Sequence, residues 1–573
     1  MRRNVVLCVA MFLWTLSAVG QDMECIMKVA GAGSEDELSL DEVEHFENLL
    51  RHPVDINNAD AGILTASGLF TSFQVASLVD YRSRHGDIMS LTELSGVDGF
   101  SADIVATLSP FIRLMSGELL FVNSGKSFMI RTEASLRGGY KTSLSDDIEH
   151  SYTAALKLRT SFADKAILSL SLSQPYNGGK PDISSLGGNI TWNHRYGKVL
   201  VGDFNVRLGQ GLCVWNTMVV GSGTSPSSMM RKPSGLSASY SFTGSSVLSG
   251  AGADFSFGRW RLAGCVYFPG IKGWKYGSDK LEVCPVVNFQ RIGRLGHVAM
   301  THMVSFSKVV GGDVRIPQMK TASDFAICIR GINIYGEVAF DWVRRESALV
   351  LGSDLNVCEG LRMGGTVRYV PFSEEHGAIL AGEYIKGHHC GTFSINATYH
   401  PYNERYGQKR GEVKLRNDWT WKALDFLSLS LRASERIRNW GPTFRTDLRA
   451  DAAFQMGQFF SNVRVNLLSC LSLSGLGYLE GGFKSKRLDV FIREGVFFVD
   501  KWDDRIYVYE RDAPGSFNVP AFYGRGLWTS LYCSCKVTKW GKLYCRTSYV
   551  SYPFMEKKKP GKAELKLMMT VKF

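Results

Sequence analysis

Hydrophobic and polar residues alternate with a period of two through most of the chain beyond residue 115. In residues 168–173 (LSLSLS) the leucines fall on one face and the serines on the other, and residues 427–434 (LSLSLRAS) repeat this pattern. Residues 564–573 (ELKLMMTVKF) also alternate, with Leu565, Leu567 and Phe573 on the apolar face. Such alternation is typical of β-strands that have one apolar and one polar face.

Segments of this kind recur about 20 to 24 times in residues 115–573, a number that fits a large closed barrel better than an ordinary sandwich. A closed barrel pairs every backbone amide and leaves no strand edge in lipid. Aromatic residues near the strand ends would form interfacial girdles: Trp192, Tyr196, Trp215, Trp419, Trp421, Trp528 and Tyr532. We therefore expect a mainly β fold, a large antiparallel transmembrane β-barrel; a soluble multidomain β protein is the alternative.

The chain ends on a strand whose last residue is Phe573. This resembles outer-membrane β-barrels, in which the final strand and its terminal aromatic residue are read by the barrel-assembly machinery. The resemblance implies that Phe573 is an assembly signal, that the assembly machinery is a partner and that the protein lies in the cell outer membrane.

The N-terminal residues 1–20 combine two arginines, an apolar run and small residues near Gly20, which is the build of a secretory signal peptide. Residues 21–34 are expected to be a linker. Beyond them no run of about 18 apolar residues exists, which excludes a helical membrane protein.

Residues 35–114 have a helical period. Ser39 and Glu42 form a capping box ahead of Val43 and Phe46, and Pro110 stops the pattern. The sequence therefore predicts a small all-α domain before the barrel, and its position in the chain predicts a periplasmic location.

Within this domain, INNADAGILTASGLF, YRSRHG, LTEL and GFS follow one another in a specific order over about 60 residues. Together they resemble the tandem helix-hairpin-helix domain of ComEA-type competence proteins. In that family the backbone amides of each hairpin, at the start of a helix, hold a DNA phosphate. The resemblance implies contacts with phosphate or another partner at Gly68, Leu69 and Phe70 and at Gly99, Phe100 and Ser101.

The charge of this domain argues against DNA binding. Residues 35–114 contain 14 Asp and Glu against four Arg and no Lys, whereas residues 115–573 contain 59 basic and 38 acidic residues. DNA affinity comes mainly from lysine and arginine, and the second glycine of the family's hairpin is replaced here by Phe70 and by Ser101. We expect the acidic domain to dock at or in the periplasmic mouth of the basic barrel instead.

The whole arrangement resembles large Bacteroidota outer-membrane proteins that carry a helix-hairpin-helix domain, a resemblance that implies no established activity. Within the barrel, the resemblance is found in residues 202–215 (GDFNVRLGQGLCVW) and 521–528 (AFYGRGLW). The turn before the last strand is basic and contains Lys557, Lys558, Lys559 and Lys562. It is either a contact for lipopolysaccharide phosphates or a solvated turn.

The sequence contains no Walker A motif for nucleotide binding and no HExxH or GxSxG motif for catalysis. His388, His389 and Cys390 are consecutive and would alternate faces of a strand, so we expect no metal site, no cofactor and no catalytic residue. The remaining cysteines have the character of small hydrophobic residues. The expected function is a non-enzymatic channel, transport conduit or scaffold with a preference for anions. DNA binding or uptake, a barrel-type hydrolase and a periplasmic protein partner remain as alternatives.

Overall fold

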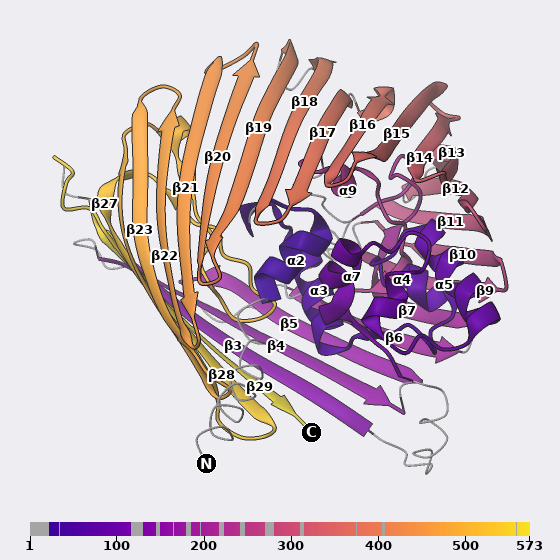
Figure 1. Ribbon diagram of the computed structural model, residues 1–573, viewed down its shortest axis with the longest axis horizontal. Coiled ribbons are helices and arrows are strands. Elements are labelled where there is room, and N and C mark those ends of the chain that lie inside the picture. Colours follow the sequence, from indigo (N-terminus) through magenta and orange to yellow (C-terminus); the bar gives the residue numbers. More distant parts are fainter. Residues whose placement is uncertain are drawn as a thin grey trace.

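The computed structural model describes residues 22–33, 35–115, 130–144, 149–163, 165–178, 185–194, 196–216, 223–240, 247–269, 280–309, 314–373, 375–403, 407–556 and 559–573. The expected signal peptide, residues 1–20, lies outside them. Strands form a wall around a group of helices that comes from the N-terminal part of the chain (Figure 1).

Within the described residues the wall is a closed antiparallel barrel of 24 strands, in which β29 pairs with β3 to complete the cycle. The prediction of a large barrel of about 20 to 24 strands is confirmed. A further short strand, β8, pairs with the end of β7, which also pairs with β9. The 24 barrel strands and the additional β8 are β3 (Ile130–Leu144), β4 (Glu149–Phe162), β5 (Ala166–Asn177), β6 (Ser185–His194), β7 (Gly197–Arg207), β8 (Gly235–Ala238), β9 (Leu248–Phe257), β10 (Trp260–Tyr267), β11 (Lys280–Gly293), β12 (Gly296–Val309), β13 (Val314–Ile329), β14 (Ile332–Asp341), β15 (Glu346–Cys358), β16 (Leu361–Val370), β17 (Glu375–Lys386), β18 (His389–Asn403), β19 (Gln408–Leu424), β20 (Leu427–Arg438), β21 (Phe444–Met456), β22 (Phe459–Ser469), β23 (Leu473–Lys484), β24 (Leu488–Val499), β27 (Gly524–Lys536), β28 (Gly541–Ser551) and β29 (Gly561–Lys572).

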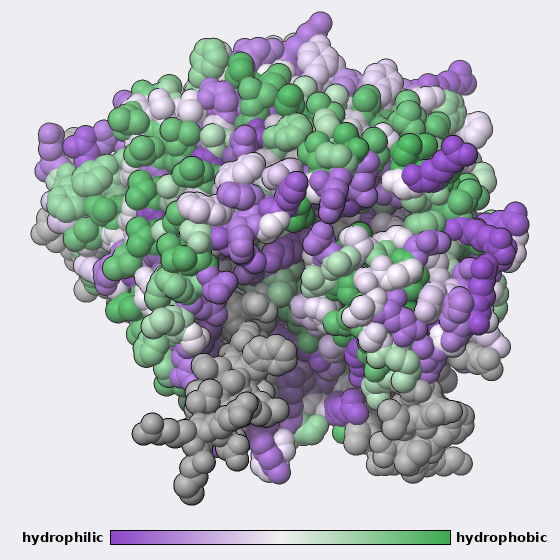
Figure 2. Space-filling model, viewed as in Figure 1, coloured by the Kyte–Doolittle hydropathy of each residue, from purple (hydrophilic) through white to green (hydrophobic). Residues whose placement is uncertain are grey.

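The outer face of the wall is apolar. Leu136 and Leu431 are 61% and 63% exposed, whereas Ser169 and Arg416, at inward positions, are buried. In Figure 2 hydrophobic side chains spread over the strand wall, and hydrophilic side chains gather between the wall and the helices. Among the described residues no helix is long and apolar enough to cross a membrane. A closed strand wall with an apolar exterior is the arrangement that β-structure needs in lipid.

The two ends of the barrel differ. At one end, here called the turn end, short turns such as residues 330–331 and 457–458 join the strands, and Ile130 and Phe573 lie there. At the other, the loop end, the connections include the long ones between β7 and β9 and between β24 and β27, the second of which is residues 500–523. In bacterial outer-membrane barrels the short turns are periplasmic and the longer loops are extracellular.

Residues 22–115 form the helical group, here called the helical plug. Its core includes Val43, Phe46 and Phe111, and the predicted capping box of Ser39 and Glu42 is present. The helices are α2 (Asp22–Ala30), η1 (Glu35–Glu37), α3 (Leu40–Arg51), α4 (Ala61–Ala66), α5 (Ser72–His85), α6 (Leu91–Leu94), α7 (Ala102–Leu108) and η2 (Ser109–Phe111), and the strands β1 (Val54–Asp55) and β2 (Ile112–Arg113) pair in parallel.

Outside the plug, the short helices are α9 (Pro226–Met229), η4 (Pro371–Ser373) and η5 (Trp502–Asp504), and a small hairpin joins β25 (Ile506–Tyr507) to β26 (Ala521–Phe522).

Two expectations from the sequence are corrected. Residues 22–30, assigned to a linker, form α2, because the buried Ile26 lets this helix join the plug core. The prediction of an aromatic girdle fits Trp192, which is 66% exposed on the outer face, but it is wrong for Trp528, which is fully buried. Its indole N–H donates to Glu510 at 2.6 Å, so it points into the barrel.

Candidate functional site

The helical plug lies inside the barrel and is fastened to its inner wall (Figure 1). Helix α5 lies against β11, β12 and β13, and α4 lies against β8 and β9. Side-chain contacts join the plug to the wall on several sides: Lys157 Nζ donates to Glu44 at 2.9 Å, Arg159 donates to Asn48 at 2.7 Å, Arg432 donates to the carbonyl of Gly33 at 2.8 Å and Ser72 Oγ lies 2.6 Å from His297 Nδ1. The contacts are polar or ionic, unlike the apolar packing inside the plug.

Two loop-end segments fold inward and contact the plug as well. In residues 223–240, Thr224 donates to the carbonyl of Gly31 at 3.0 Å and Lys232 donates to the carbonyl of Leu69 at 2.9 Å. Burial lowers the pKa of Lys232 to about 8. In residues 500–523, the Gly515 amide donates to Glu47 at 3.3 Å, and Phe517 packs against the plug core. The plug is therefore held by loops from the loop end in addition to the wall.

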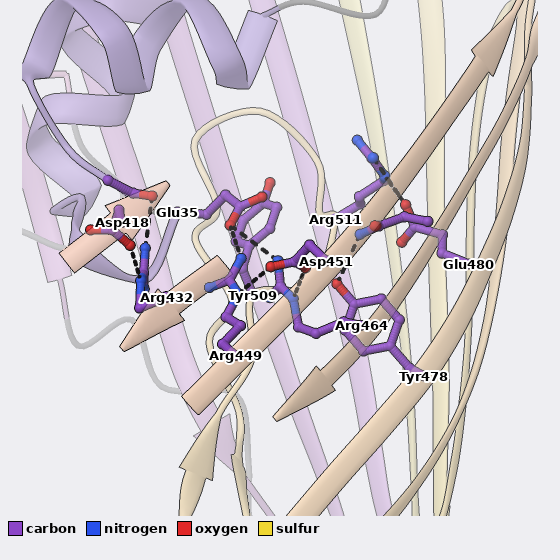
Figure 3. Close-up of polar contacts among 12 residues, drawn as sticks. Glu35, Asp418, Arg432, Arg449, Asp451, Arg464, Tyr478, Glu480, Tyr509 and Arg511 are labelled. Carbon is purple, nitrogen blue, oxygen red and sulfur yellow. Dashed lines mark hydrogen bonds and ion pairs between the residues drawn. The ribbon is translucent and has the colours of Figure 1, made fainter. Parts of the chain in front are cut away.

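Arginines on neighbouring strands share carboxylates along one side of the inner wall (Figure 3). Asp418 accepts from Arg416 and Arg432, each at 2.5 Å. The same arrangement recurs two strands further on, where Asp451 accepts from Arg449 at 2.6 Å and from Arg464. We call such a group an Arg–carboxylate–Arg unit. Each unit has two positive charges for one negative charge.

A third unit includes one of the inward loops. Glu480 on β23 accepts from Arg493 on β24 at 2.7 Å and from Arg511 in residues 500–523 at 2.9 Å. Arg493 and Arg464 also lie over the Tyr478 ring, at 4.3 and 5.2 Å. This unit ties the loop to the wall next to the first two units (Figure 3).

The plug supplies carboxylates to these units. Glu37 of η1 forms an ion pair with Arg416, and Glu35 lies 3.9 Å from both Arg449 and Arg464. Excess positive charge on the wall is thus met by acidic residues of the plug. The docking expected from the opposite charges of the two parts matches these contacts, although the plug lies within the barrel and contacts both its wall and its loops.

A buried hydroxyl, imidazole and carboxylate meet where α5 touches the wall. Ser72 Oγ lies 2.6 Å from His297 Nδ1, and His297 Nε2 lies 2.8 Å from Asp324. These residue types also form the catalytic triad of serine hydrolases. All three are buried, however, and neither of the polar cavities described below is lined by them. The geometry is that of a hydrogen-bonded contact between plug and wall.

The glycine pair in residues 202–215 has a role that the sequence did not indicate. Gly209 and Gly211 both adopt positive φ, and the amides of Gln210 and Leu212 donate to the buried Glu337 carboxylate at 2.6 and 3.1 Å. The pair lies in the loop after β7, where it lets the chain wrap around this carboxylate.

Two polar cavities adjoin the plug. One, of about 300 Å³, lies between α3 and the wall, and its lining includes Asp41, Glu47 and Lys198. The other, of about 310 Å³, lies at the loop end between strands β19 to β22 and residues 503–507, with Glu37 of the plug in its lining. We call the second cavity the arginine pocket, because its lining includes Arg416, Arg432, Arg436, Arg438, Arg445, Arg449 and Arg505.

The predicted hairpins form turns between α4 and α5 and between α6 and α7. Gly68 and Gly99 adopt positive φ, at 68° and 85°, and Phe70 and Phe100 are buried in the plug core. Ser101 is the N-cap of α7. The first turn is covered by the inward loop, since Lys232 binds the Leu69 carbonyl. The side chains of Phe70 and Phe100 therefore stabilise the plug.

The remaining predicted positions lie apart from this site. Phe573 is 75% exposed at the turn end, and its amide donates to the carbonyl of Thr132 at 2.8 Å. Lys559 lies over the Tyr552 ring at 4.1 Å, and Lys562 is the second residue of the last strand. Lys557 and Lys558 lie outside the described residues. No disulfide joins the eleven cysteines in the described part of the chain to one another, and no group of three or more potential metal ligands occurs there.

A signal for the first two units was present in the sequence. Residues 416–418 (RND) and 449–451 (RAD) place an arginine and an aspartate two positions apart, and therefore on one face of a strand. The partners Arg432 and Arg464 come from adjacent strands and depend on strand register, which local patterns do not give.

These features define the class of the protein: it is an outer-membrane β-barrel with a helical plug in its interior. No protein-family model matches the chain, and no curated protein matches it. Among solved structures, the siderophore receptor PirA from Pseudomonas aeruginosa is 8% identical, with 78% of this chain and 81% of that chain covered and a TM-score of 0.43. The copper transporter OprC is 9% identical, with 78% and 81% covered and a TM-score of 0.38. OpdO from Pseudomonas aeruginosa is 8% identical, with 78% and 97% covered and a TM-score of 0.30. Such low scores define no family and no function.

Proposed function

We propose that the protein is a gated conduit of the outer membrane, in which the helical plug closes the barrel and shifts to let a solute pass. The observation that carries this proposal is the way the plug is held. Its own core is apolar, but ion pairs and hydrogen bonds such as Glu44 with Lys157 and Glu37 with Arg416 fasten it to the wall. Polar contacts can be exchanged for contacts with water or solute, so the plug can loosen without unfolding.

A permanently attached scaffold is the competing role within the same class. Two cavities beside the plug favour the conduit, because one adjoins η1 and the other adjoins α3, so the plug does not fill all the space next to it. Excess positive charge in residues 115–573 favours anions as the solute.

Planar-bilayer conductance tests the proposal. The triple variant Glu35→Gln, Glu37→Gln and Glu44→Gln weakens the plug's ionic contacts and is expected to raise the conductance well above that of the wild type. A matched triple variant at exposed plug positions, Glu24→Gln, Asp80→Asn and Asp103→Asn, changes the charge equally and is expected to leave conductance low. Equal conductance of the two variants, or preference for cations in the open state, would contradict the proposal.

DNA uptake has less support. The plug is acidic, and the first hairpin turn is covered by Lys232. DNA affinity depends on lysine and arginine that neutralise phosphates. Retardation of DNA by the purified full-length protein at low salt would revive this alternative.

A further inference from the structure

A fourth cluster of the kind described above adjoins the arginine pocket, and its two arginines line the pocket. Glu412 on β19 accepts from Arg438 at 2.7 Å and lies 3.4 Å from Arg436, so two guanidinium groups share one carboxylate. The first two units each receive a carboxylate from the plug, Glu37 or Glu35. For Arg436 and Arg438, the contacts seen among the described residues include no plug carboxylate.

Cations are also placed next to one another across the strands of this pocket. Arg436 lies directly opposite Lys414 on β19 and directly opposite Arg445 on β21. Like charges in directly opposed positions destabilise a sheet. An anion between these side chains would remove that repulsion.

Two further arginines are held by neutral groups. Arg445 donates to the carbonyls of Asp503 and Arg505, at 2.5 and 3.1 Å. Arg505 donates to the Tyr507 hydroxyl at 2.7 Å and lies over the Trp502 ring at 4.8 Å. These contacts fix the two guanidinium groups in the lining of the pocket. The lining as a whole has eight lysine and arginine side chains and three carboxylates, those of Glu37, Asp447 and Asp503, so positive charge is in excess.

We infer that the arginine pocket binds a small soluble anion that carries two or more carboxylate or phosphate groups, and that this anion competes with Glu37 for Arg416. Arginine binds both kinds of acid group through paired N–H donors. A volume of about 310 Å³ suits a small molecule. Because the pocket faces the lumen at the loop end, its ligand arrives through water and not through the lipid.

The competition gives the ligand a way to act on the plug. Glu37 belongs to η1, which precedes α3, and its partner Arg416 lines the pocket. An anion that takes over Arg416 releases Glu37, and by reciprocity loss of Glu37 strengthens anion binding. This step rests on the proposed function, in which loosening of the plug opens the conduit.

Titration calorimetry of the full-length protein in detergent, with citrate and with inorganic pyrophosphate as probes and sucrose as a neutral control, tests the site. Arg445→Gln is expected to weaken binding of at least one probe by about 10- to 100-fold. The control Arg525→Gln removes a loop-end arginine that pairs with Asp500 outside the pocket and is expected to change binding by less than about twofold. Absence of binding to the wild type, or equal weakening by both variants, would overturn the inference.

The competition between Glu37 and the anion is tested by a variant that is expected to strengthen anion binding, whereas Arg445→Gln is expected to weaken it. Glu37→Gln is expected to tighten binding by about 3- to 10-fold, whereas Asp500→Asn, which adds the same charge at the loop end, is expected to have no effect. Equal affinities of Glu37→Gln and the wild type would overturn the competition. Binding in detergent requires no flux, so a conductance response to plug variants without anion binding would overturn this inference and leave the proposed function standing.

Discussion

The Glu44 carboxylate of the plug lies 2.9 Å from the Lys157 ammonium group of the barrel wall, and their side chains are only 13% and 5% exposed. This pair joins two parts of the chain that are 113 residues apart. Water is largely excluded from both charges, so each depends on the other for its stabilisation.

Removal of one member of this pair is expected to loosen the plug. Glu44→Ala leaves the Lys157 ammonium buried without its carboxylate, at a cost of about 3 to 5 kcal/mol. Thermal unfolding of the plug, followed by circular dichroism, measures the loss. Glu24→Ala is the matched control, because Glu24 and Lys28 form an exposed pair that contributes little. The double variant Glu44→Leu with Lys157→Met is expected to recover much of the stability, and a loss as large as in Glu44→Ala would contradict this explanation.

His45, the next residue on α3, predicts a pH dependence of plug docking. Burial, together with the nearby positive charge of Arg207, lowers the pKa of His45 from 6.5 to about 4. The neutral ring donates from Nε2 to the carbonyl of Ser67 at 2.8 Å. A released plug would take up a proton near pH 6.5, whereas the docked plug would not, so docking is stable above this value and is weakened progressively as the pH falls toward about 4.

The expected contribution is about 3 kcal/mol, which is a shift of roughly 2.5 pKa units converted to free energy. Plug unfolding in the wild type is compared with that in His45→Gln, which keeps a donor for Ser67 but does not titrate. The difference in stability between the two proteins is expected to change between about pH 7 and about pH 4.5. A constant difference across this range would show that His45 does not contribute.

The sequence identified the strands because alternation is a local property. The outward leucines of residues 168–173 and the inward Arg432 of residues 427–434 lie on the expected faces. The pattern did not place Trp528 correctly, since a tryptophan suits an interfacial girdle as well as a polar interior that offers it an acceptor such as Glu510. That acceptor comes from a loop whose inward fold is not encoded in the alternation of β27.

Of the candidate site, only the opposite charges of the plug and the barrel could be predicted from the sequence. Opposite signs of the plug and the barrel indicated docking, but they did not indicate which residues meet. Arg432 and the carbonyl of Gly33 are 399 positions apart, and their contact depends on barrel closure, strand register and the path of the plug. Ser72, His297 and Asp324 were missed for the same reason, since they come from a helix and two strands that only the fold brings together.

Ser72 provides a test of the hydrolase alternative. Ser72→Ala removes the hydroxyl that His297 contacts and is expected to destabilise plug docking by about 1 to 3 kcal/mol, because the buried ring loses a partner. Wild-type protein is expected to show no turnover of ester, lipid or peptide substrates. Ser83→Ala, which removes an exposed hydroxyl on the same helix, is the control for stability. Turnover by the wild type that Ser72→Ala abolishes would establish a catalytic role instead.

Substitution of Gly99, the glycine of the second hairpin, tests whether this turn needs glycine for packing within the plug or for another role such as phosphate binding. Gly86 and Gly99 both adopt positive φ, 83° and 85°, so alanine strains the backbone at both positions. A Cβ atom at Gly99 would lie 2.9 Å from the Phe73 ring, whereas one at Gly86 would meet nothing within 4 Å. Gly99→Ala is therefore expected to destabilise the plug by about 1 to 3 kcal/mol more than Gly86→Ala, as measured by thermal unfolding of the full-length protein. Equal losses would mean that contact with Phe73 does not require glycine there, and that the hairpin keeps Gly99 for another reason.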